Sequence, residues 1–238
     1  MKSRKKASNP AGITRYISLL AVLALANSRY LIGLFILTSA AFTEARPRTV
    51  SAAFFGDVYR LSKDTEGLGG FAGQKALFDE LDPDTLRLCV GDLLYPNTLS
   101  KKQDGGRHRI DLLNDFNLTT CALGNHDLDG GEENTLARIS ESNFPWLAAN
   151  AIDNDGNYYT GDQQLLIFER NGIKIAVFGL MSEETPRLVI MANNITFTPI
   201  VPTARRMVEE ARQQGAQIII ALTHMEPHED KYLAKKVK

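Results

Sequence analysis

The sequence predicts an α/β fold with mixed, largely parallel sheets flanked by helices. From residue 49 onward, apolar strand-like segments alternate with amphipathic helix-like segments, which is the pattern of βαβ units. Asn171-Gly172 stands between two β-rich segments and predicts one antiparallel hairpin within this arrangement. The chain has 238 residues, 44% of them hydrophobic, which is enough for a sizeable core.

The elements follow one another in a regular order along the chain. Strands are predicted within residues 49–57, 85–92, 118–125, 144–150 and 216–224, and the hairpin within 163–180. Helices are predicted within residues 69–81, 106–116, 132–142 and 201–215, and from residue 229. The apolar run at 216–224 is continuous, so that strand is expected to be fully buried.

Composition excludes a class of partner. The formal net charge is −1, and no basic stripe of the kind that binds nucleic acid interrupts the domain. A nucleic acid polymer is therefore not an expected partner. His108 lies in a basic turn and His228 at the start of the last helix, and both are expected at the surface.

Residues 1–45 differ from the rest of the chain. A basic start is followed by two apolar runs separated by Arg29, each shorter than the roughly 18 residues of a membrane span. Each run fits the apolar region of a secretory signal, about 7–15 residues long. A cleaved signal peptide is the favoured interpretation and an uncleaved membrane anchor the alternative. In both cases the domain at residues 49–238 would be exported.

Export would place Cys89 and Cys121 in a compartment that permits disulfides. Both cysteines lie inside apolar, strand-like runs, where a free cysteine acts as a small buried hydrophobe. A disulfide and two buried free thiols are both compatible with these positions, because sequence does not give the distance between them.

Polar residues end four of the predicted strands. Asp57, Asp92, Asn125-His126 and His224 each stand where a strand gives way to the next segment. In open α/β sheets, ligands bind beyond the carboxyl ends of the strands, so these side chains are expected to converge. Gly-Asp after one strand is ordinary turn chemistry, but four such ends together predict a site.

The chemistry of these residues predicts a metal centre. Carboxylate, amide and imidazole ligands without a thiolate suit Zn, Mn, Fe or Mg. A carboxylate can bridge two divalent ions about 3.5–4 Å apart, an arrangement that clamps a phosphoryl group and activates water. His126 would then supply a proton to the leaving oxygen, and Asp129, three residues on, would orient its imidazole.

Several motifs carry a resemblance to a known family. The segments GDVY, VGDLLYPNTLS, GNHDLDGG, FPWLAAN and ALTH occur in this order between residues 56 and 224. In this respect the chain resembles the calcineurin-like metallophosphoesterases, and most of all the catalytic domain of the 5′-nucleotidase family. The resemblance covers residues 49–238 and implies a layered metallophosphoesterase fold.

The resemblance also implies roles for individual residues. Asp92 would bridge two divalent metal ions, Asp57 would bind one of them, and Asn125 and His224 the other. His126 and its acidic partner would form a dyad that acts in the transition state. The implied activity is hydrolysis of phosphate monoesters, with nucleotides as the expected small-molecule substrates.

The chain departs from the family pattern in two ways. The family usually begins its first motif Asp-x-His, whereas Tyr59 follows Asp57-Val58 here. The family also takes ligands from a later Gly-His-x-His motif and has a C-terminal nucleotide-binding domain, and neither occurs before Lys238. The resemblance therefore implies a fold incomplete at its C-terminus, and a catalytically impaired fragment or non-catalytic remnant is the alternative function.

Overall fold

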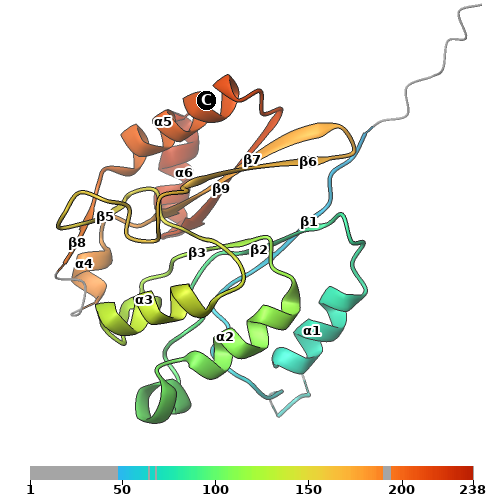
Figure 1. Cartoon of the computed structure of the whole chain (residues 1–238), viewed down its shortest axis with the longest axis vertical. Helices are drawn as coiled ribbons and strands as arrows, with labels where there is room; N and C mark the ends of the chain where they lie inside the picture. The colour runs from blue at the N-terminus through green and yellow to red at the C-terminus, as the bar shows by residue number, and fades with distance from the viewer. Residues whose placement is uncertain (1–47, 64, 68, 190–193, 238) are drawn as a thin grey trace, which may run out of the picture. The chain divides into compact units, whose positions relative to one another are not determined.

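The computed structural model describes residues 48–63, 65–67, 69–189 and 194–237 (Figure 1). The predicted signal segment at residues 1–45 lies outside this part of the chain. The described domain has four layers, a pair of sheets with helices on each outer side. No helix in the described ranges is long and apolar enough to cross a membrane.

The first sheet is parallel throughout, as predicted. Its order is β1 (Ala52–Phe55), β2 (Leu86–Cys89), β3 (Thr120–Ala122) and β4 (Trp146–Leu147). The outer face of this sheet is covered by α1 (Phe71–Asp79), α2 (Arg107–Leu113) and α3 (Glu132–Glu141). These helices lie in the connections between consecutive strands, as the alternating sequence pattern requires.

The second sheet is mixed. Its order is β6 (Leu165–Arg170), β7 (Ile173–Met181) and β9 (Ile218–His224), and α5 (Ile200–Gln213) and α6 (Pro227–Lys236) cover its outer face. The predicted hairpin joins β6 to β7, and Asn171 and Gly172 both adopt positive φ, as a type I′ turn demands. Strand β9 pairs in parallel with β7.

Shorter elements complete the described domain. The helical turn η2 (Asn114–Phe116) continues α2 and lies within the helix predicted at residues 106–116. The others were not predicted: an antiparallel pair, β5 (Ala151–Asp153) with β8 (Ile195–Phe197), and the helical turns η1 (Ser100–Asp104), η3 (His126–Leu128) and α4 (Thr185–Leu188). Each has five residues or fewer, which is too short to leave a periodic signal in the sequence.

The prediction that residues 216–224 form a fully buried strand is wrong. In the described part of the second sheet, β9 is an edge strand that pairs with β7 alone. Ile218 is 37% exposed, and Ala221 is also exposed. A continuous apolar run does indicate a strand, but it does not distinguish a central position from an edge position.

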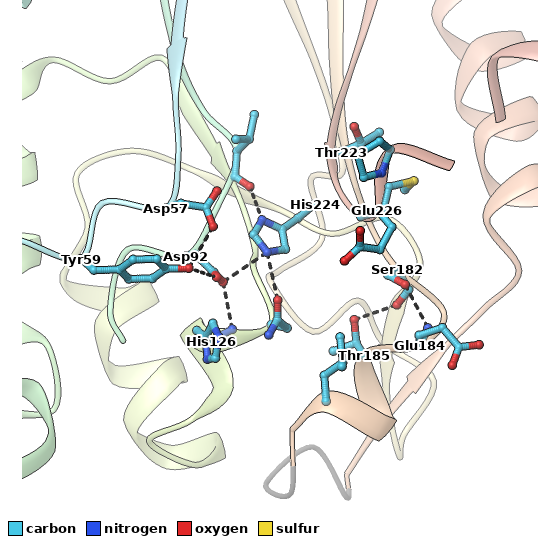
Figure 2. A pocket seen from close by; sticks show the side chains of 15 residues that line it. Asp57, Tyr59, Asp92, His126, Ser182, Glu184, Thr185, Thr223, His224 and Glu226 are labelled. Atoms are coloured by element: carbon cyan, nitrogen blue, oxygen red, sulfur yellow. Dashed lines mark hydrogen bonds and ion pairs between the residues drawn. The ribbon is translucent and has the colours of Figure 1, made fainter. Parts of the chain in front are cut away.

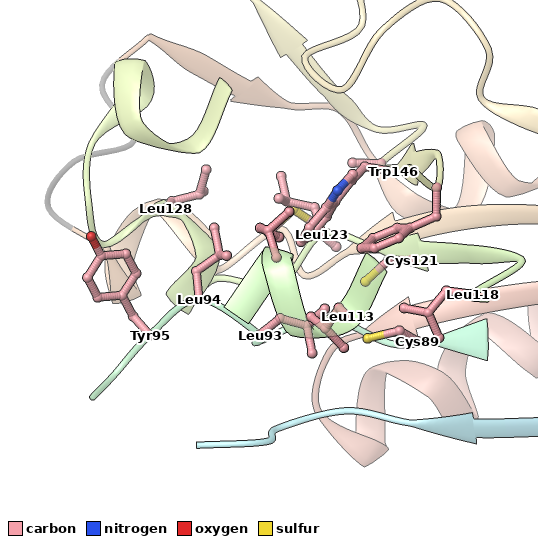
Figure 3. Close-up of a cluster of buried hydrophobic side chains, with 14 of the residues drawn as sticks. Cys89, Leu93, Leu94, Tyr95, Leu113, Leu118, Cys121, Leu123, Leu128 and Trp146 are labelled. Carbon is pink, nitrogen blue, oxygen red and sulfur yellow. The ribbon is translucent and has the colours of Figure 1, made fainter. Parts of the chain in front are cut away.

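Alternating side chains build a core between the sheets and a core beneath each helical layer. Leu86 and Leu88 of β2 face Ile175 and Val177 of β7, and this cluster joins the two sheets. Cys89 points to the opposite side, into the cluster under α1, α2 and α3 (Figure 3). Strands β2 and β7 are thus buried on both faces, which accounts for their strongly apolar sequences.

Cys89 and Cys121 are register partners on β2 and β3, and both are completely buried free thiols. Burial, together with the neighbouring Cys89 thiol, raises the pKa of Cys121. Both side chains therefore pack as small apolar groups in this structure (Figure 3).

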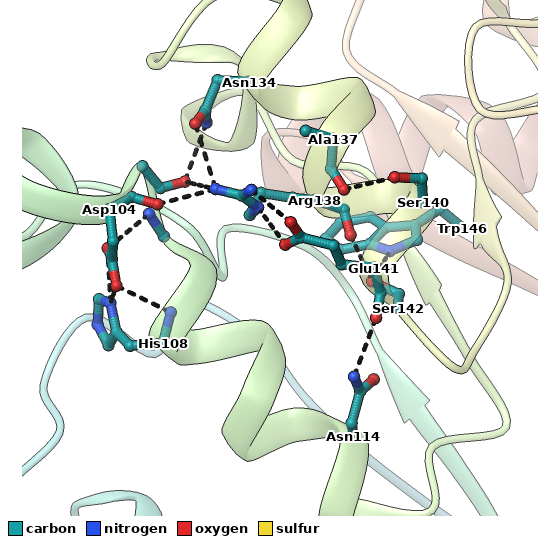
Figure 4. A network of polar contacts seen from close by, with 12 residues as sticks. Asp104, His108, Asn114, Asn134, Ala137, Arg138, Ser140, Glu141, Ser142 and Trp146 are labelled. Atoms are coloured by element: carbon teal, nitrogen blue, oxygen red, sulfur yellow. Dashed lines mark hydrogen bonds and ion pairs between the residues drawn. The ribbon is translucent and has the colours of Figure 1, made fainter.

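A polar network links α2 and α3 through Asp104 at the end of η1 (Figure 4). Arg138 donates to the backbone oxygen of Asp104 at 2.8 Å and pairs with Glu141 at 2.7 Å. The Nδ1 atom of His108 lies 2.8 Å from Asp104 Oδ2 and the residue is half-buried, so its predicted place at the free surface is wrong. The second surface prediction is confirmed, because His228 is exposed on α6.

Gly179 of β7 lies directly against the backbone of β4, and its substitution tests the packing of the two sheets. A Cβ at this position would lie 2.2 Å from the backbone oxygen of Leu147, so Gly179→Ala must push β7 away from β4. We expect the free energy of unfolding to fall by about 1–3 kcal/mol, the usual effect of overpacking. Urea denaturation measures it.

Gly73→Ala is the matched control, because a Cβ there meets nothing within 4 Å and the residue lies in α1. This change should be neutral or stabilise the protein by up to about 1 kcal/mol. Equal effects of the two substitutions would contradict the close approach of the sheets.

Candidate metal centre

The polar residues that end the strands meet in one cavity of about 730 Å³ (Figure 2). Its lining includes five of the six residues predicted from the sequence, namely Asp57, Asp92, Asn125, His126 and His224. The sixth, Asp129, contacts His126 from outside this lining. The convergence expected at the carboxyl ends of the strands is therefore present.

Backbone conformation aims two of the carboxylates into the cavity. Asp57 and Asp92 have φ values of 55° and 58°, in the left-handed region that non-glycine residues rarely adopt. Each costs about 1–2 kcal/mol relative to the right-handed conformation and follows a glycine at the end of a strand. Such strain concentrates at functional sites, where the surrounding structure enforces it.

The loops after β2 and β3 touch through glycines. A Cβ on Gly91 would lie 2.7 Å from the backbone nitrogen of Gly124, and one on Gly124 would lie 2.3 Å from Asp92 Oδ1. No larger residue fits at either position without moving the neighbouring loop. The glycines that flank the motifs thus bring Asp92 and Asn125 to the same edge of the sheet.

Asp92 lies at the centre of the site, 2% exposed, and its two oxygens face in different directions. Oδ1 accepts a hydrogen bond from the backbone nitrogen of His126 at 2.9 Å and lies 3.3 Å from His224 Nε2. Oδ2 lies 2.7 Å from the hydroxyl of Tyr59. Burial alone would raise the pKa of Asp92, but hydrogen bonding to His224 and its charge lower it overall.

His224 is held in a fixed orientation by the other sheet. Its Nδ1 lies 2.7 Å from the carbonyl oxygen of Val90, to which it donates, and its Nε2 lies 3.0 Å from Asn125 Oδ1. Burial lowers the pKa of His224, but Asp92 outweighs this effect and raises the value to about 9. A backbone carbonyl bound to one ring nitrogen is the usual way a protein orients a metal-binding histidine.

Tyr59 belongs to the same cluster. Its hydroxyl lies 2.9 Å from Asp57 Oδ1 and 2.7 Å from Asp92 Oδ2. Burial and the two neighbouring carboxylates raise the pKa of Tyr59 above its usual range. One ligand atom from each of Asp57, Asp92 and His224 lies within 4.8 Å of the others, so these residues fit a divalent cation.

His126 and Asp129 form the predicted pair. The Nδ1 atom of His126 lies 2.8 Å from Asp129 Oδ2 within the turn that begins at η3. The His126 side chain is 37% exposed and lines the cavity, whereas its backbone nitrogen contacts Asp92. The imidazole is therefore oriented by a carboxylate and accessible to a bound molecule.

Sequence reasoning missed Asp127, which is completely buried. Its carboxylate accepts hydrogen bonds from the backbone nitrogens of Asp92, Leu93, Leu94 and Gly124 at 2.7–2.9 Å. Burial and the charge of Asp92 raise the pKa of Asp127 to about 6, so it remains ionised at neutral pH. The sequence offers no signal for this role, because three of the four bonds come from a loop more than 30 residues away.

Residues 51–237 match the model of the calcineurin-like phosphoesterase family. The chain belongs to this family. Among its relatives are a 5′-nucleotidase of Vibrio vulnificus, 30% identical over 72% of this chain and 32% of that protein, and an NAD 5′-nucleotidase of Haemophilus influenzae, 30% identical over 71% and 29%. The chain thus spans about a third of these relatives' length.

Solved structures of this family agree with the fold. The NAD nucleotidase of Haemophilus influenzae superimposes with a TM-score of 0.69 at 27% identity, covering 78% of this chain and 36% of that one. A 5′-nucleotidase precursor from Thermus thermophilus gives a TM-score of 0.72 at 22% identity, covering 79% and 39%. The predicted metallophosphoesterase fold is therefore confirmed.

Asp127→Asn tests the buried carboxylate. The substitution places a donor NH2 group among backbone N–H donors, and each buried donor left without a partner costs about 1–3 kcal/mol. We expect the free energy of unfolding to fall by at least that amount in urea denaturation. Asp111→Asn, on the exposed side of α2, is the control and should change stability by less than about 0.5 kcal/mol. Equal stability of the two variants would contradict the bracing role of Asp127.

Proposed function

We propose that this chain carries the metal-dependent catalytic centre of a phosphomonoester hydrolase, with nucleotides as the substrate class. The observation that carries the proposal is the arrangement around Asp92. Its Oδ1 lies 3.3 Å from His224, whose ring in turn contacts Asn125, and its Oδ2 lies 2.7 Å from the Tyr59 hydroxyl, which in turn contacts Asp57. Two clusters of ligand atoms thus share one carboxylate, which is the donor arrangement that a pair of divalent ions requires.

Each cluster would hold one ion. Asp57 and Asp92 would bind the first, and Asp92, Asn125 and His224 the second. Two divalent ions supply charge that clamps a phosphoryl group and lower the pKa of bound water. Zn, Mn, Fe and Mg all suit this donor set, which consists of oxygen and imidazole nitrogen without sulfur.

His126 would assist departure of the leaving group. When the ester P–O bond breaks, the leaving oxygen needs a proton, which His126 Nε2 can provide while Nδ1 stays bound to Asp129 at 2.8 Å. The carboxylate of Asp129 fixes the orientation of the imidazole. The imidazole is thus assigned to proton transfer, and the backbone nitrogen of His126 to holding Asp92.

Nucleotides are proposed because the relatives named above are nucleotidases. A cavity of about 730 Å³ is within the range that encloses small organic ligands, roughly 300–1,000 Å³. Export of the domain remains part of the proposal, since it rests on the N-terminal sequence outside the described residues.

Hydrolysis is tested by phosphate release from AMP and from p-nitrophenyl phosphate, with added Mn or Zn. We expect release that depends on the metal, is abolished by EDTA and returns when metal is restored. AMP should be the better substrate if the cavity recognises the nucleoside. A protein that binds metal but releases no phosphate from either ester would refute the hydrolase assignment and favour the non-catalytic alternative.

His126→Ala separates catalysis from metal binding. We expect turnover to fall about 10²–10⁴-fold, the usual contribution of general acid–base catalysis, with nearly unchanged metal content. Asp129→Asn should have a milder effect, because it alters only the orientation and charge of the imidazole.

Asp92→Ala is the contrasting variant, and it should lose bound metal as measured by elemental analysis. If His126→Ala loses as much metal as Asp92→Ala, His126 is a ligand and the proposed dyad is wrong.

A further inference from the structure

We propose that Tyr59 is itself a metal ligand, which supplies its phenolic oxygen to the ion held by Asp57 and Asp92. This inference rests on the proposed function and assigns a third oxygen donor to one of its two metal positions. The three donors come from two separate loops, those after β1 and β2, and they meet at one side of the cavity (Figure 2).

The distances among the oxygens fit a shared cation. The Tyr59 hydroxyl oxygen lies 2.9 Å from Asp57 Oδ1 and 2.7 Å from Asp92 Oδ2. Oxygens in adjacent positions around an octahedral ion, each about 2.0–2.1 Å from it, lie about 2.9 Å apart. Both distances from the phenolic oxygen therefore match the spacing of neighbouring ligands around one ion.

Hydrogen bonding alone does not satisfy these three atoms. A phenol carries one proton, so Tyr59 can donate to Asp57 or to Asp92 but not to both at once. The remaining close contact would then join two oxygens that both carry lone pairs. A cation bound by all three oxygens removes this conflict. Its positive charge favours the ionised phenol, whereas the two carboxylates alone disfavour it.

A buried arginine holds Tyr59 in this place. Arg109 is 1% exposed and donates to the backbone oxygens of Val58 and Tyr59, and its guanidinium stacks over the ring of Phe71 at 5.4 Å. Burying a charged side chain is costly unless its donors are bound. Arg109 thus fixes the backbone of the loop, and this fixed backbone positions the phenol of Tyr59 between the two carboxylates.

Binding is an exchange of a proton for a metal ion. The O–H bond of Tyr59 breaks, the proton passes to solvent, and an oxygen–metal bond forms without oxidation or reduction. A phenolic ligand favours hard ions of high charge, of which ferric ion is the most informative probe. Phenolate bound to ferric ion absorbs visible light, whereas carboxylate and imidazole complexes of the same ion lack that intense band.

The experiment adds ferric citrate to the metal-free protein and records visible absorption together with iron content. Wild type should bind iron and become coloured. Tyr59→Phe should lose the colour and bind ferric ion at least about 10–100-fold more weakly, the range seen when even an indirect metal contact is removed. Tyr232→Phe is the control, because Tyr232 is 52% exposed on α6, and this variant should behave as wild type.

Three results would overturn the assignment: no uptake of iron by wild type, uptake without the visible band, or a band that persists in Tyr59→Phe. Phosphate release from AMP with Mn is measured on the same proteins. Hydrolysis without the iron band would refute the role of Tyr59 and leave the proposed function intact. The band without hydrolysis would refute the function and leave the ligand assignment intact.

Discussion

The arrangement of the site depends on one buried carboxylate. Asp127 accepts hydrogen bonds from the loop after β2 and from the loop after β3, so a single side chain sets the spacing between Asp92 and Asn125. Four backbone donors offset the burial of one negative charge, which would otherwise be strongly unfavourable. The hydroxyl of Thr135 in α3 donates to the backbone oxygen of Asp127 at 2.9 Å, so α3 also helps to hold Asp127 in place.

Backbone conformation then sets the positions of the carboxylates at the cavity. With the loops fixed, Gly91 and Gly124 allow them to touch, and the left-handed conformation of Asp57 and Asp92 turns both carboxylates into the cavity. The polar atoms then stand within hydrogen-bonding distance of one another around Tyr59 and around His224. Burial and the neighbouring carboxylates raise the pKa of Tyr59, and Asp92 raises the pKa of His224 against the effect of burial.

The sequence predicted the features that repeat along the chain or stand at strand ends. Alternating periodicity located the major strands and helices, and the strand ends located the residues of the cavity. It did not reveal Asp127, because this residue differs from its motif neighbours only in pointing inward to distant backbone. It marked Tyr59 only as a departure from the family's Asp-x-His pattern, because the position of a side chain between two carboxylates depends on tertiary structure. For the same reason it misplaced His108 and the edge strand β9.

The first sheet supplies three residues of the proposed centre and the second sheet supplies one. The geometry of the site therefore depends on how the two sheets pack together. Asp57, Asp92 and Asn125 follow strands of the first sheet, whereas His224 ends β9 of the second. The hydrogen bond from His224 to the carbonyl of Val90 crosses from one sheet to the other at the cavity itself. Below it, the apolar cluster of Leu88, Val177 and their neighbours sets the distance between the sheets. A change in that core would move the imidazole relative to Asp57, Asp92 and Asn125, so the inter-sheet core is a structural part of the proposed metal centre.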